Sequence, residues 1–241
     1  MSQTASFQNK RSAPLIAIVG ADGSGKTTVG QELLDWLQTM RPTAFCHLGK
    51  QTGNWGRAIA RLPFVGKKLD KQVIARSSKA RDEKGAGAAV SAIIFILSMR
   101  RVFRFMRMQR LHRKGFTILT DRYPQAVVPG PMDGPGLVAR SPKGMIARFL
   151  TRQEQALYNW MASYPPDIVI RLNVDLGTAL KRKPDHRPAS LERKVRDVPR
   201  LTFNGAPILD LDSTEPLDQV IRKAKEAILA TIARYDQATA K

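Results

Sequence analysis

Short apolar runs alternate along this chain with longer segments in which apolar residues recur every three or four positions. The short runs are typical of buried parallel strands, and the longer period is typical of helices that cover a sheet. Because the two kinds of segment alternate, we expect an α/β fold with one mainly parallel sheet and helices on both faces. The expected strands lie at residues 15–19, 43–48, 116–121, 167–172 and 207–211.

One expected helix, between residues 88 and 114, begins apolar and turns strongly basic at Arg100. Its apolar part is shorter than the ~20 residues that a membrane-spanning helix needs, so a helix buried in the protein is the better interpretation. We expect one narrow apolar stripe on it, with several arginines on a neighbouring face. The stripe is Met99, Val102, Phe103 and Met106, and the arginines are Arg100, Arg104 and Arg107.

A second long helix is expected at residues 143–164, because Ser141-Pro142 is typical of a helix start and Pro165-Pro166 ends the periodic segment. Its apolar positions recur at helical spacing. These positions are Ile146, Phe149, Leu150, Leu157, Trp160 and Met161.

A glycine-rich sequence follows the first apolar run directly and opens the first helix, at residues 28–40. It matches the pattern G-x-x-x-x-G-K-[ST], whose glycines let successive backbone N–H groups point at a phosphate. Lys26 is expected to reach the β- and γ-phosphates of ATP, and Thr27 to offer its hydroxyl to Mg²⁺. The residues expected to bind the nucleotide are Gly20, Asp22, Gly23, Ser24, Gly25, Lys26, Thr27 and Thr28.

The third apolar run ends in a carboxylate, Asp121. Ligands of open parallel sheets bind at the carboxyl ends of the strands, so we expect Asp121 beside the glycine-rich loop, holding Mg²⁺ directly or through water. An aspartate that only caps a turn is the alternative. Tyr123 then opens a loop rich in proline and glycine, with Asp133 as its one carboxylate, and such a loop beside a sheet end is suited to recognising a phosphate acceptor.

A dense group of cations lies at residues 181–196, beside Pro184 and Pro188. Such a segment can form a mobile lid that folds arginine side chains over phosphates during transfer. A solvated basic loop is the alternative that these residues alone leave open.

The charge balance is unusual, because 40 lysines and arginines against 20 acidic residues give a formal net charge of +20 over 241 residues. Such a surface attracts polyanions, which include nucleotides, nucleic acids and anionic membranes. One cysteine and three scattered histidines exclude a disulfide framework and a structural zinc site, and they fit a reducing compartment. We expect residues 1–13 to form a disordered basic tail without a signal peptide, and residues 14–241 one cytoplasmic domain. A homodimer is compatible with this composition.

With these segments assigned, the chain resembles the thymidylate kinase-like branch of the nucleoside monophosphate kinases, from about residue 15 to residue 229. The resemblance rests on the segment from Asp22 to Thr28, on Asp121-Arg122-Tyr123, on Pro166-Asp167 and on the arginine-rich segment before Glu192-Arg193. It implies a three-layer P-loop kinase fold with a five-stranded parallel sheet in the order 2-3-1-4-5. It also implies that Arg182, Arg187 and Arg193 are lid residues, that Asp22 and Arg122 face the acceptor, and that Arg100 binds a phosphate of the acceptor.

The sequence departs from that family around the acceptor. Cys46-His47-Leu48-Gly49-Lys50 stands where family thymidylate kinases carry Arg-Glu-Pro, and Pro124-Gln125-Ala126 replaces a segment that helps them select the base. The phosphate-binding residues therefore match the family better than the acceptor pocket does.

We expect an ATP- and Mg²⁺-dependent kinase of a small, phosphorylated acceptor such as a nucleoside monophosphate, with Lys26, Asp121 and the lid arginines as its catalytic residues. A kinase of a polysaccharide-pathway or lipid-linked acceptor, peripheral to an anionic membrane through residues 88–114, is one alternative. An NTP-dependent nucleic-acid-binding protein is the other. The chain shows no helix-turn-helix signal and no interleaved surface aromatics, which disfavours specific nucleic-acid binding.

Overall fold

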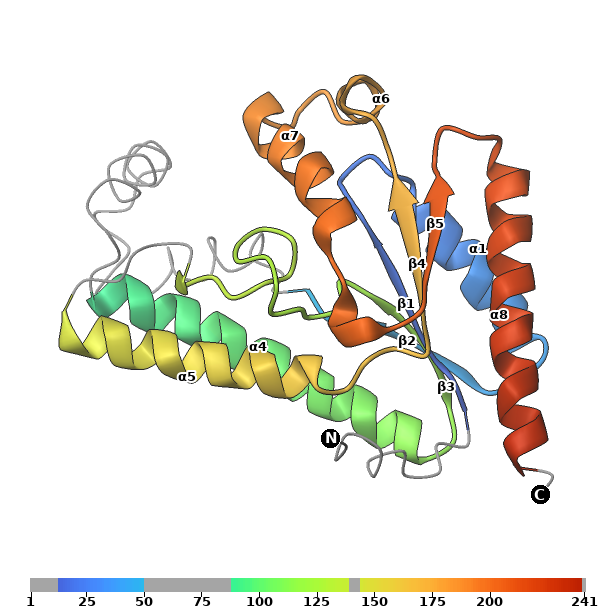
Figure 1. The fold of residues 1–241 in the computed structure, drawn as a ribbon, viewed down its shortest axis with the longest axis horizontal. Helices are drawn as coiled ribbons and strands as arrows, with labels where there is room; N and C mark the ends of the chain where they lie inside the picture. Colours follow the sequence, from blue (N-terminus) through green and yellow to red (C-terminus); the bar gives the residue numbers. More distant parts are fainter. Residues whose placement is uncertain (1–12, 50–87, 139–143, 240–241) are drawn as a thin grey trace, which may run out of the picture.

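A computed structural model describes residues 13–49, 88–138 and 144–239. Within these residues five parallel strands form one sheet in the order β2-β3-β1-β4-β5 (Figure 1). This order confirms the predicted α/β P-loop architecture. The strands are β1 (Leu15–Gly20), β2 (Thr43–His47), β3 (Thr117–Asp121), β4 (Ile168–Asn173) and β5 (Ile208–Asp212).

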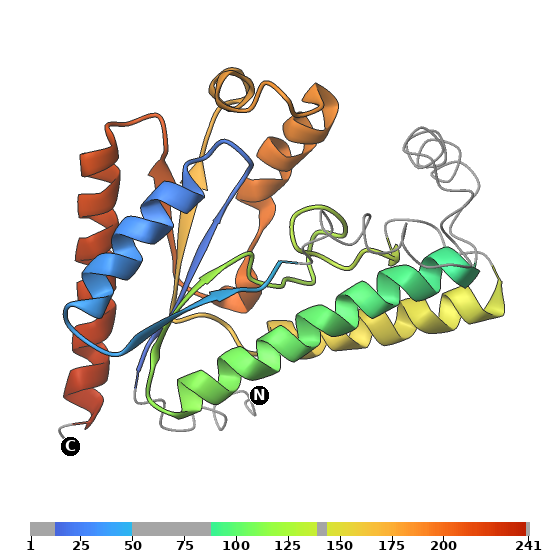
Figure 2. The same cartoon turned by 180° about the vertical axis from the view of Figure 1, so that it is seen from behind.

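Helices cover both faces of the sheet, as Figures 1 and 2 show from opposite sides. The helices are α1 (Lys26–Gln38), α4 (Ala88–Arg113), α5 (Met145–Ala162), α6 (Leu176–Arg182), α7 (Pro188–Asp197) and α8 (Leu217–Thr239), with short 3₁₀ turns η3 (Val198–Arg200) and η4 (Phe203–Gly205). Successive residues of β1 belong to two different apolar clusters. Ile16 and Ile18 belong to the cluster that includes residues of α1 and α8, whereas Ala17 and Val19 belong to the cluster that includes residues of α4, α5 and α7. The central strand is thus buried on both faces, which explains why its sequence is one continuous apolar run.

The side of α4 that faces the core differs from the predicted stripe. Phe103 is 64% exposed and Met106 is 37% exposed, whereas Phe105 and Met108 are buried. The prediction is therefore wrong at Phe103 and Met106. The physical cause of this difference is Arg101. Arg101 is buried on the same side of the helix as Phe105, and this side of the helix therefore faces the core. A charged residue on the buried face hides that face from a search for apolar periodicity.

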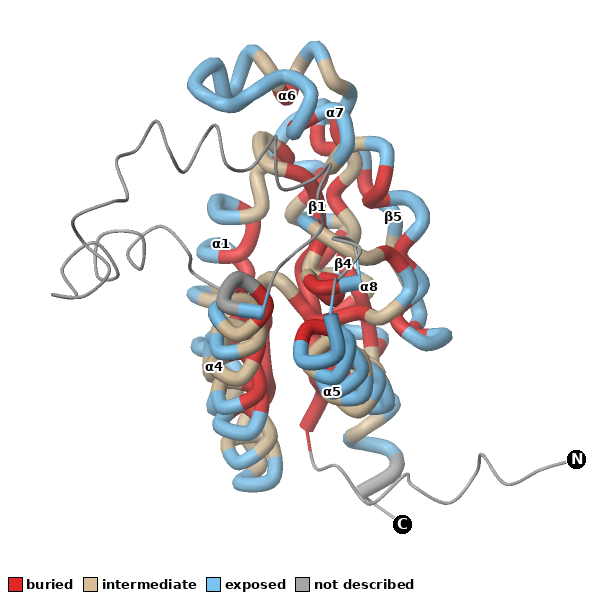
Figure 3. Tube along the Cα trace, turned by 90° about the vertical axis from the view of Figure 1, so that its left-hand side faces the viewer, coloured by how far each residue is buried: buried red, intermediate tan, exposed pale blue. Residues whose placement is uncertain are grey.

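The inward face of α5 includes only some of its apolar positions, because Met161 is buried whereas Ile146 and Phe149 are exposed. Figure 3 shows α4 and α5 side by side with their buried positions turned toward the rest of the protein. The fully buried Glu154 accounts for the difference, since its carboxylate accepts a hydrogen bond from the Leu137 backbone N–H at 2.6 Å and another from the Ser98 hydroxyl of α4. The expected start at Ser141-Pro142 lies outside the described residues, and the observed helix begins at Met145.

No helix in the described part of the chain combines the length and apolar character that crossing a bilayer requires.

Candidate phosphate-transfer site

The glycine-rich loop connects the carboxyl end of β1 with the start of α1. Gly23 and Gly25 have φ angles of 85° and 79°, a left-handed backbone that glycine adopts without strain. A side chain at Gly23 would also lie 3.0 Å from the carbonyl oxygen of Ala179. Among the described residues no side chain caps α1, and its first turn contains no acidic residue. The first N–H groups of α1 and its positive dipole end are therefore suited to an anion.

Lys26 begins α1 and donates a hydrogen bond from its ammonium to the Ala21 carbonyl at 2.6 Å. Burial and, to a smaller extent, the positive charge of Arg122 lower the pKa of Lys26 to about 8, although Asp121, Asp22 and Asp133 act in the opposite direction. These influences place Lys26 among three carboxylates and one guanidinium. Its ammonium is thus poorly hydrated, which strengthens its interaction with an incoming anion.

Asp121 lies at the carboxyl end of β3, in register with Ile18 of β1 and His47 of β2. Its Oδ2 is 3.2 Å from His47 Nδ1. Burial alone would raise the pKa of Asp121, but the hydrogen bond from His47 and the charges of Lys26 and Arg122 hold this pKa below its ordinary value. The carboxylate is consequently ionised at neutral pH.

The second oxygen of Asp121 is buried and has no hydrogen-bond partner among the described residues. Buried polar atoms almost always have a partner, so this oxygen fits a metal ion or a metal-bound water. The described segments hold no cluster of three or more His, Cys, Asp or Glu residues that could bind a metal by themselves. Mg²⁺ in nucleotide sites takes one or two carboxylates, water and phosphate oxygens, so the Asp121 side chain, next to Lys26, fits this ion.

Three basic side chains lie around Asp22 of the glycine-rich loop. Its carboxylate accepts a hydrogen bond from Lys194 of α7 and lies 3.5 Å from Arg122 Nη2 and 3.6 Å from His186 Nε2. Burial would raise the pKa of Asp22, but Lys194, Lys26 and Arg122 together keep it below its ordinary value. Arg122 itself has a left-handed φ of 62°, which turns its side chain from the end of β3 back toward the loop.

The three predicted lid arginines lie in different surroundings. Arg182 spans two elements at the loop, donating to the Gly23 and Ser213 carbonyls at 3.1 Å each. Arg187 is an exposed residue at the start of α7, and Arg193 lies 3.7 Å from Asp197. The residues of the expected lid that contact Asp22 are instead Lys194 and His186. Sequence reasoning missed both, although both lie in the cationic segment it singled out.

The loop that carries Asp133 is organised from within by Gln125, a residue that sequence reasoning also missed as a functional residue. The buried Gln125 amide donates to the carbonyls of Val128 and Met132 at 2.6 and 2.8 Å, and its oxygen accepts from the N–H groups of Val127 and Val128. One side chain thus fixes four backbone groups of this loop.

Asp133 is held by the buried Arg101 of α4. The guanidinium donates to the Asp133 carbonyl at 2.8 Å and to its carboxylate, and it lies over the Tyr158 ring. Burial would lower the pKa of Arg101, but Tyr158 and Asp133 raise it, so the guanidinium stays charged. The predicted acceptor residue Asp133 is therefore already engaged by an arginine, and it presents a held carboxylate to the site.

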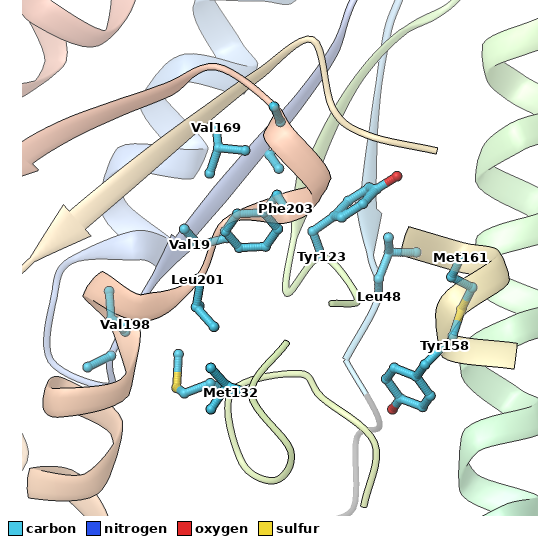
Figure 4. Packing of buried hydrophobic residues seen from close by; sticks show 14 of the residues in the cluster. Val19, Leu48, Tyr123, Met132, Tyr158, Met161, Val169, Val198, Leu201 and Phe203 are labelled. Atoms are coloured by element: carbon cyan, nitrogen blue, oxygen red, sulfur yellow. The ribbon is translucent and has the colours of Figure 1, made fainter. Parts of the chain in front are cut away.

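Asp121, Lys26 and Asp133 line one cleft at the carboxyl end of the sheet, together with Arg122 and Tyr123. Its apolar side is formed by Met132, Leu201 and Phe203, and Figure 4 shows Phe203 between Val19 and Tyr123. The open space is about 10 Å³, close to that of a single water molecule. Gly20 and Lys26 of the glycine-rich loop also line the cleft, whereas the other predicted nucleotide-binding residues of the loop do not. Of the predicted catalytic and acceptor-binding residues, those that do not line this cleft are Asp22, Arg100, Arg182, Arg187 and Arg193. Arg104, on the same helix as Arg100, donates a hydrogen bond to the Gly49 carbonyl at 2.5 Å.

No protein-family model matches the sequence. Two curated proteins of Escherichia coli K12 are similar to it over nearly its whole length. The chain is 38% identical to the uncharacterized ATP-binding protein YghS over 230 residues, which are 94% of this chain and 97% of YghS. It is 39% identical to the uncharacterized ATP-binding protein YghR over 217 residues, 89% of this chain and 86% of YghR. At this identity and coverage, the chain belongs to the family of YghS and YghR.

Proposed function

We propose that this protein is an ATP- and Mg²⁺-dependent kinase, similar to thymidylate kinases, that transfers the γ-phosphoryl group of ATP to a small phosphorylated acceptor. The observation that carries the proposal is the meeting of Lys26, Asp121 and Arg122 in one cleft beside the glycine-rich loop. The names of YghS and YghR, which call both relatives ATP-binding proteins, support the part of the proposal that concerns ATP binding.

In this proposal the donor is bound by the loop and the start of α1. Backbone N–H groups and Lys26 bind the phosphates, while Thr27, exposed at the start of α1, and Asp121 hold Mg²⁺. The metal supplies charge neutralisation at the phosphates when it is bound. Arg182, anchored at the Gly23 carbonyl, is the lid arginine closest to the loop and stabilises charge that develops during transfer.

The acceptor is expected to enter between Arg122 and the Asp133 loop. If its nucleophile is a phosphate oxygen, it is already ionised and needs no strong base. If its nucleophile is a hydroxyl, Asp22 and Asp121 are the two candidates to accept the proton, and neighbouring basic groups lower the pKa of both carboxyls. The cleft in its present form is too narrow for either acceptor, so the loop or α7 must move to admit one.

A phosphate-transfer screen tests this function. Purified protein, γ-labelled ATP and Mg²⁺ are incubated with nucleoside monophosphates, nucleosides and sugar phosphates, and labelled products are separated. We expect transfer to at least one phosphorylated acceptor at a rate well above ATP hydrolysis by the protein alone. Transfer to none of these acceptors, in protein that binds ATP, contradicts the kinase assignment.

ATP affinity is expected to fall about tenfold between pH 7 and pH 9. The pKa of Lys26, about 8, lies below its ordinary value, so the ammonium loses its proton as the pH rises through this range. A phosphate group with a pKa near 6 is already about nine-tenths ionised at pH 7 and gains only a little negative charge by pH 9, so its titration does not account for a loss of affinity. Calorimetric titration with Mg²⁺ and ATP at each pH measures the effect.

Arg122→Gln provides the control for this pH dependence. Removing the like charge raises the pKa of Lys26, so the loss of affinity should move to higher pH in the variant. An unchanged affinity of the native protein from pH 7 to pH 9.5 would show that Lys26 does not bind the phosphates as an ammonium.

A further inference from the structure

A second hollow, of about 270 Å³, lies beside the cleft and takes no part in the proposed donor site. Arg193, Arg196 and Arg200, from α7 and η3, line one wall, with Asp197 beneath them. The opposite wall is formed by residues 127–129 of the Asp133 loop. Its volume is slightly below the range of roughly 300–1,000 Å³ that is typical of sites for drug-sized ligands. The hollow therefore suits one charged group with its immediate neighbours.

The three arginines share a single negative charge. The Asp197 carboxylate is 3% exposed and lies 3.7 Å from Arg193, 3.6 Å from Arg196 and 3.4 Å from Arg200. The three arginines and Asp197 together carry a net charge of +2 at this wall. Each guanidinium has five N–H donors and uses few of them on Asp197, so most donors are left for another oxyanion.

Hydrogen bonds from the sheet hold the backbone segment that carries Arg200. Arg171 of β4 donates to the backbone carbonyls of Pro199 and Leu201, at 3.2 and 3.0 Å, and is itself held by Asp210 of β5. These bonds tie the segment that carries Arg200 to the sheet. Asp197 accepts a hydrogen bond from Arg200 at 3.4 Å and forms longer ion pairs with Arg193 and Arg196. Donors that are held in place before a ligand arrives lose little entropy when it binds.

The facing wall is fixed as well, and it is apolar. Gln125 fixes the backbone N–H groups of Val127 and Val128, and the Val127 side chain is 56% exposed. A valine and proline surface opposite three arginines removes water from one side of a bound anion, which strengthens its attraction to the guanidiniums. Planar guanidiniums match phosphate oxygens in pairs better than they match single negative charges.

We propose that this hollow is a binding site for a phosphate or diphosphate group, and that in the working enzyme this group belongs to the acceptor, remote from the atom that receives the phosphoryl group. The assignment to the acceptor rests on the proposed kinase function, whereas the anion site itself does not. The Asp133 loop links the two places, because its residues Met132 and Asp133 line the transfer cleft and its residues 127–129 line the hollow.

The anion site is tested with inorganic pyrophosphate as the probe. Calorimetric titrations without Mg²⁺ use Lys26→Ala protein, to weaken binding at the glycine-rich loop, and are repeated in the native background. The test variant carries Arg196→Gln and Arg200→Gln. The matched control carries Arg110→Gln and Arg222→Gln, two exposed arginines of α4 and α8 that do not line the hollow, so it loses the same net charge. Circular dichroism checks that each variant is folded.

We expect saturable pyrophosphate binding that weakens at least about tenfold in the test variant and less than about twofold in the control. Absence of saturable binding in both backgrounds, or an equal loss in test and control variants, overturns the anion site.

The source of the anion is decided by kinetics on the acceptors found in the screen. If the acceptor supplies it, the test variant raises KM at least about tenfold for acceptors with a second phosphate, leaves kcat unchanged, and leaves acceptors without that phosphate unaffected. Unchanged KM values for all acceptors, with pyrophosphate binding lost, overturn the acceptor assignment and leave a site for free phosphate anions. Transfer to no acceptor overturns the kinase proposal and the acceptor assignment together, and the pyrophosphate titration still decides the anion site.

Discussion

Lys26→Ala is expected to weaken ATP binding at least about tenfold and to slow phosphate transfer by about 10²–10³-fold. The ammonium is partly buried and poorly hydrated, and it lies at the start of a helix whose first N–H groups are not capped by any side chain in the described segments. Removing a donor of this kind from a site that binds developing charge typically costs two to three powers of ten in rate. Titration calorimetry measures the affinity, and single-turnover transfer of labelled phosphate measures the rate.

Lys181→Ala is the matched control, because Lys181 is an exposed lysine of the neighbouring helix α6. It removes the same charge and should leave both quantities within about twofold. An ATP affinity and a transfer rate that survive Lys26→Ala would remove the basis for the entire donor site. Thermal unfolding of both variants separates a lost contact from a lost fold.

The strand pattern could be predicted from the sequence because each strand is a short apolar run, and the sheet order followed from the family resemblance. The inward faces of α4 and α5 could not be predicted, because charged residues occupy them. Arg101 and Glu154 are both fully or almost fully buried, yet a count of apolar residues assigns their positions to the surface. Burying them is possible only because Asp133, Tyr158, Leu137 and Ser98 provide partners, and these partners are distant in the sequence.

The candidate site could likewise be predicted only where a residue's role is set by a local sequence signal. Lys26 and Asp121 could be located because a motif and a strand end place them, and the structure brings them into one cleft. His47 was missed because its role depends on strand pairing, which sets β2 beside β3 and so brings His47 to Asp121. Gln125 was missed because a glutamine in a loop has no sequence signal for the four backbone groups that it binds. Only the register and the loop geometry reveal such partners.

Asp121→Asn is expected to reduce phosphate transfer by about 100-fold at low Mg²⁺ while ATP affinity changes less than about threefold. Asparagine keeps the shape and can still accept a hydrogen bond from His47 at one atom, but it loses the negative charge that fits Mg²⁺. Losing a group that binds or orients a metal typically costs about 10–100-fold in metal affinity or activity. The measurement is the rate of transfer over a series of Mg²⁺ concentrations, where the half-saturating concentration should rise in the variant.

Asp175→Asn is the control for this substitution. Asp175 is an exposed aspartate that caps α6 by accepting a hydrogen bond from the Thr178 N–H at 2.8 Å, and asparagine caps helices as well as aspartate does. Its Mg²⁺ dependence should match that of the native protein. The two carboxylates differ in one respect that matters, since Asp121 alone has a buried oxygen without a hydrogen-bond partner among the described residues. A metal dependence that Asp121→Asn leaves unchanged would mean that this oxygen serves another purpose, and the Mg²⁺ site would have to lie elsewhere along the loop.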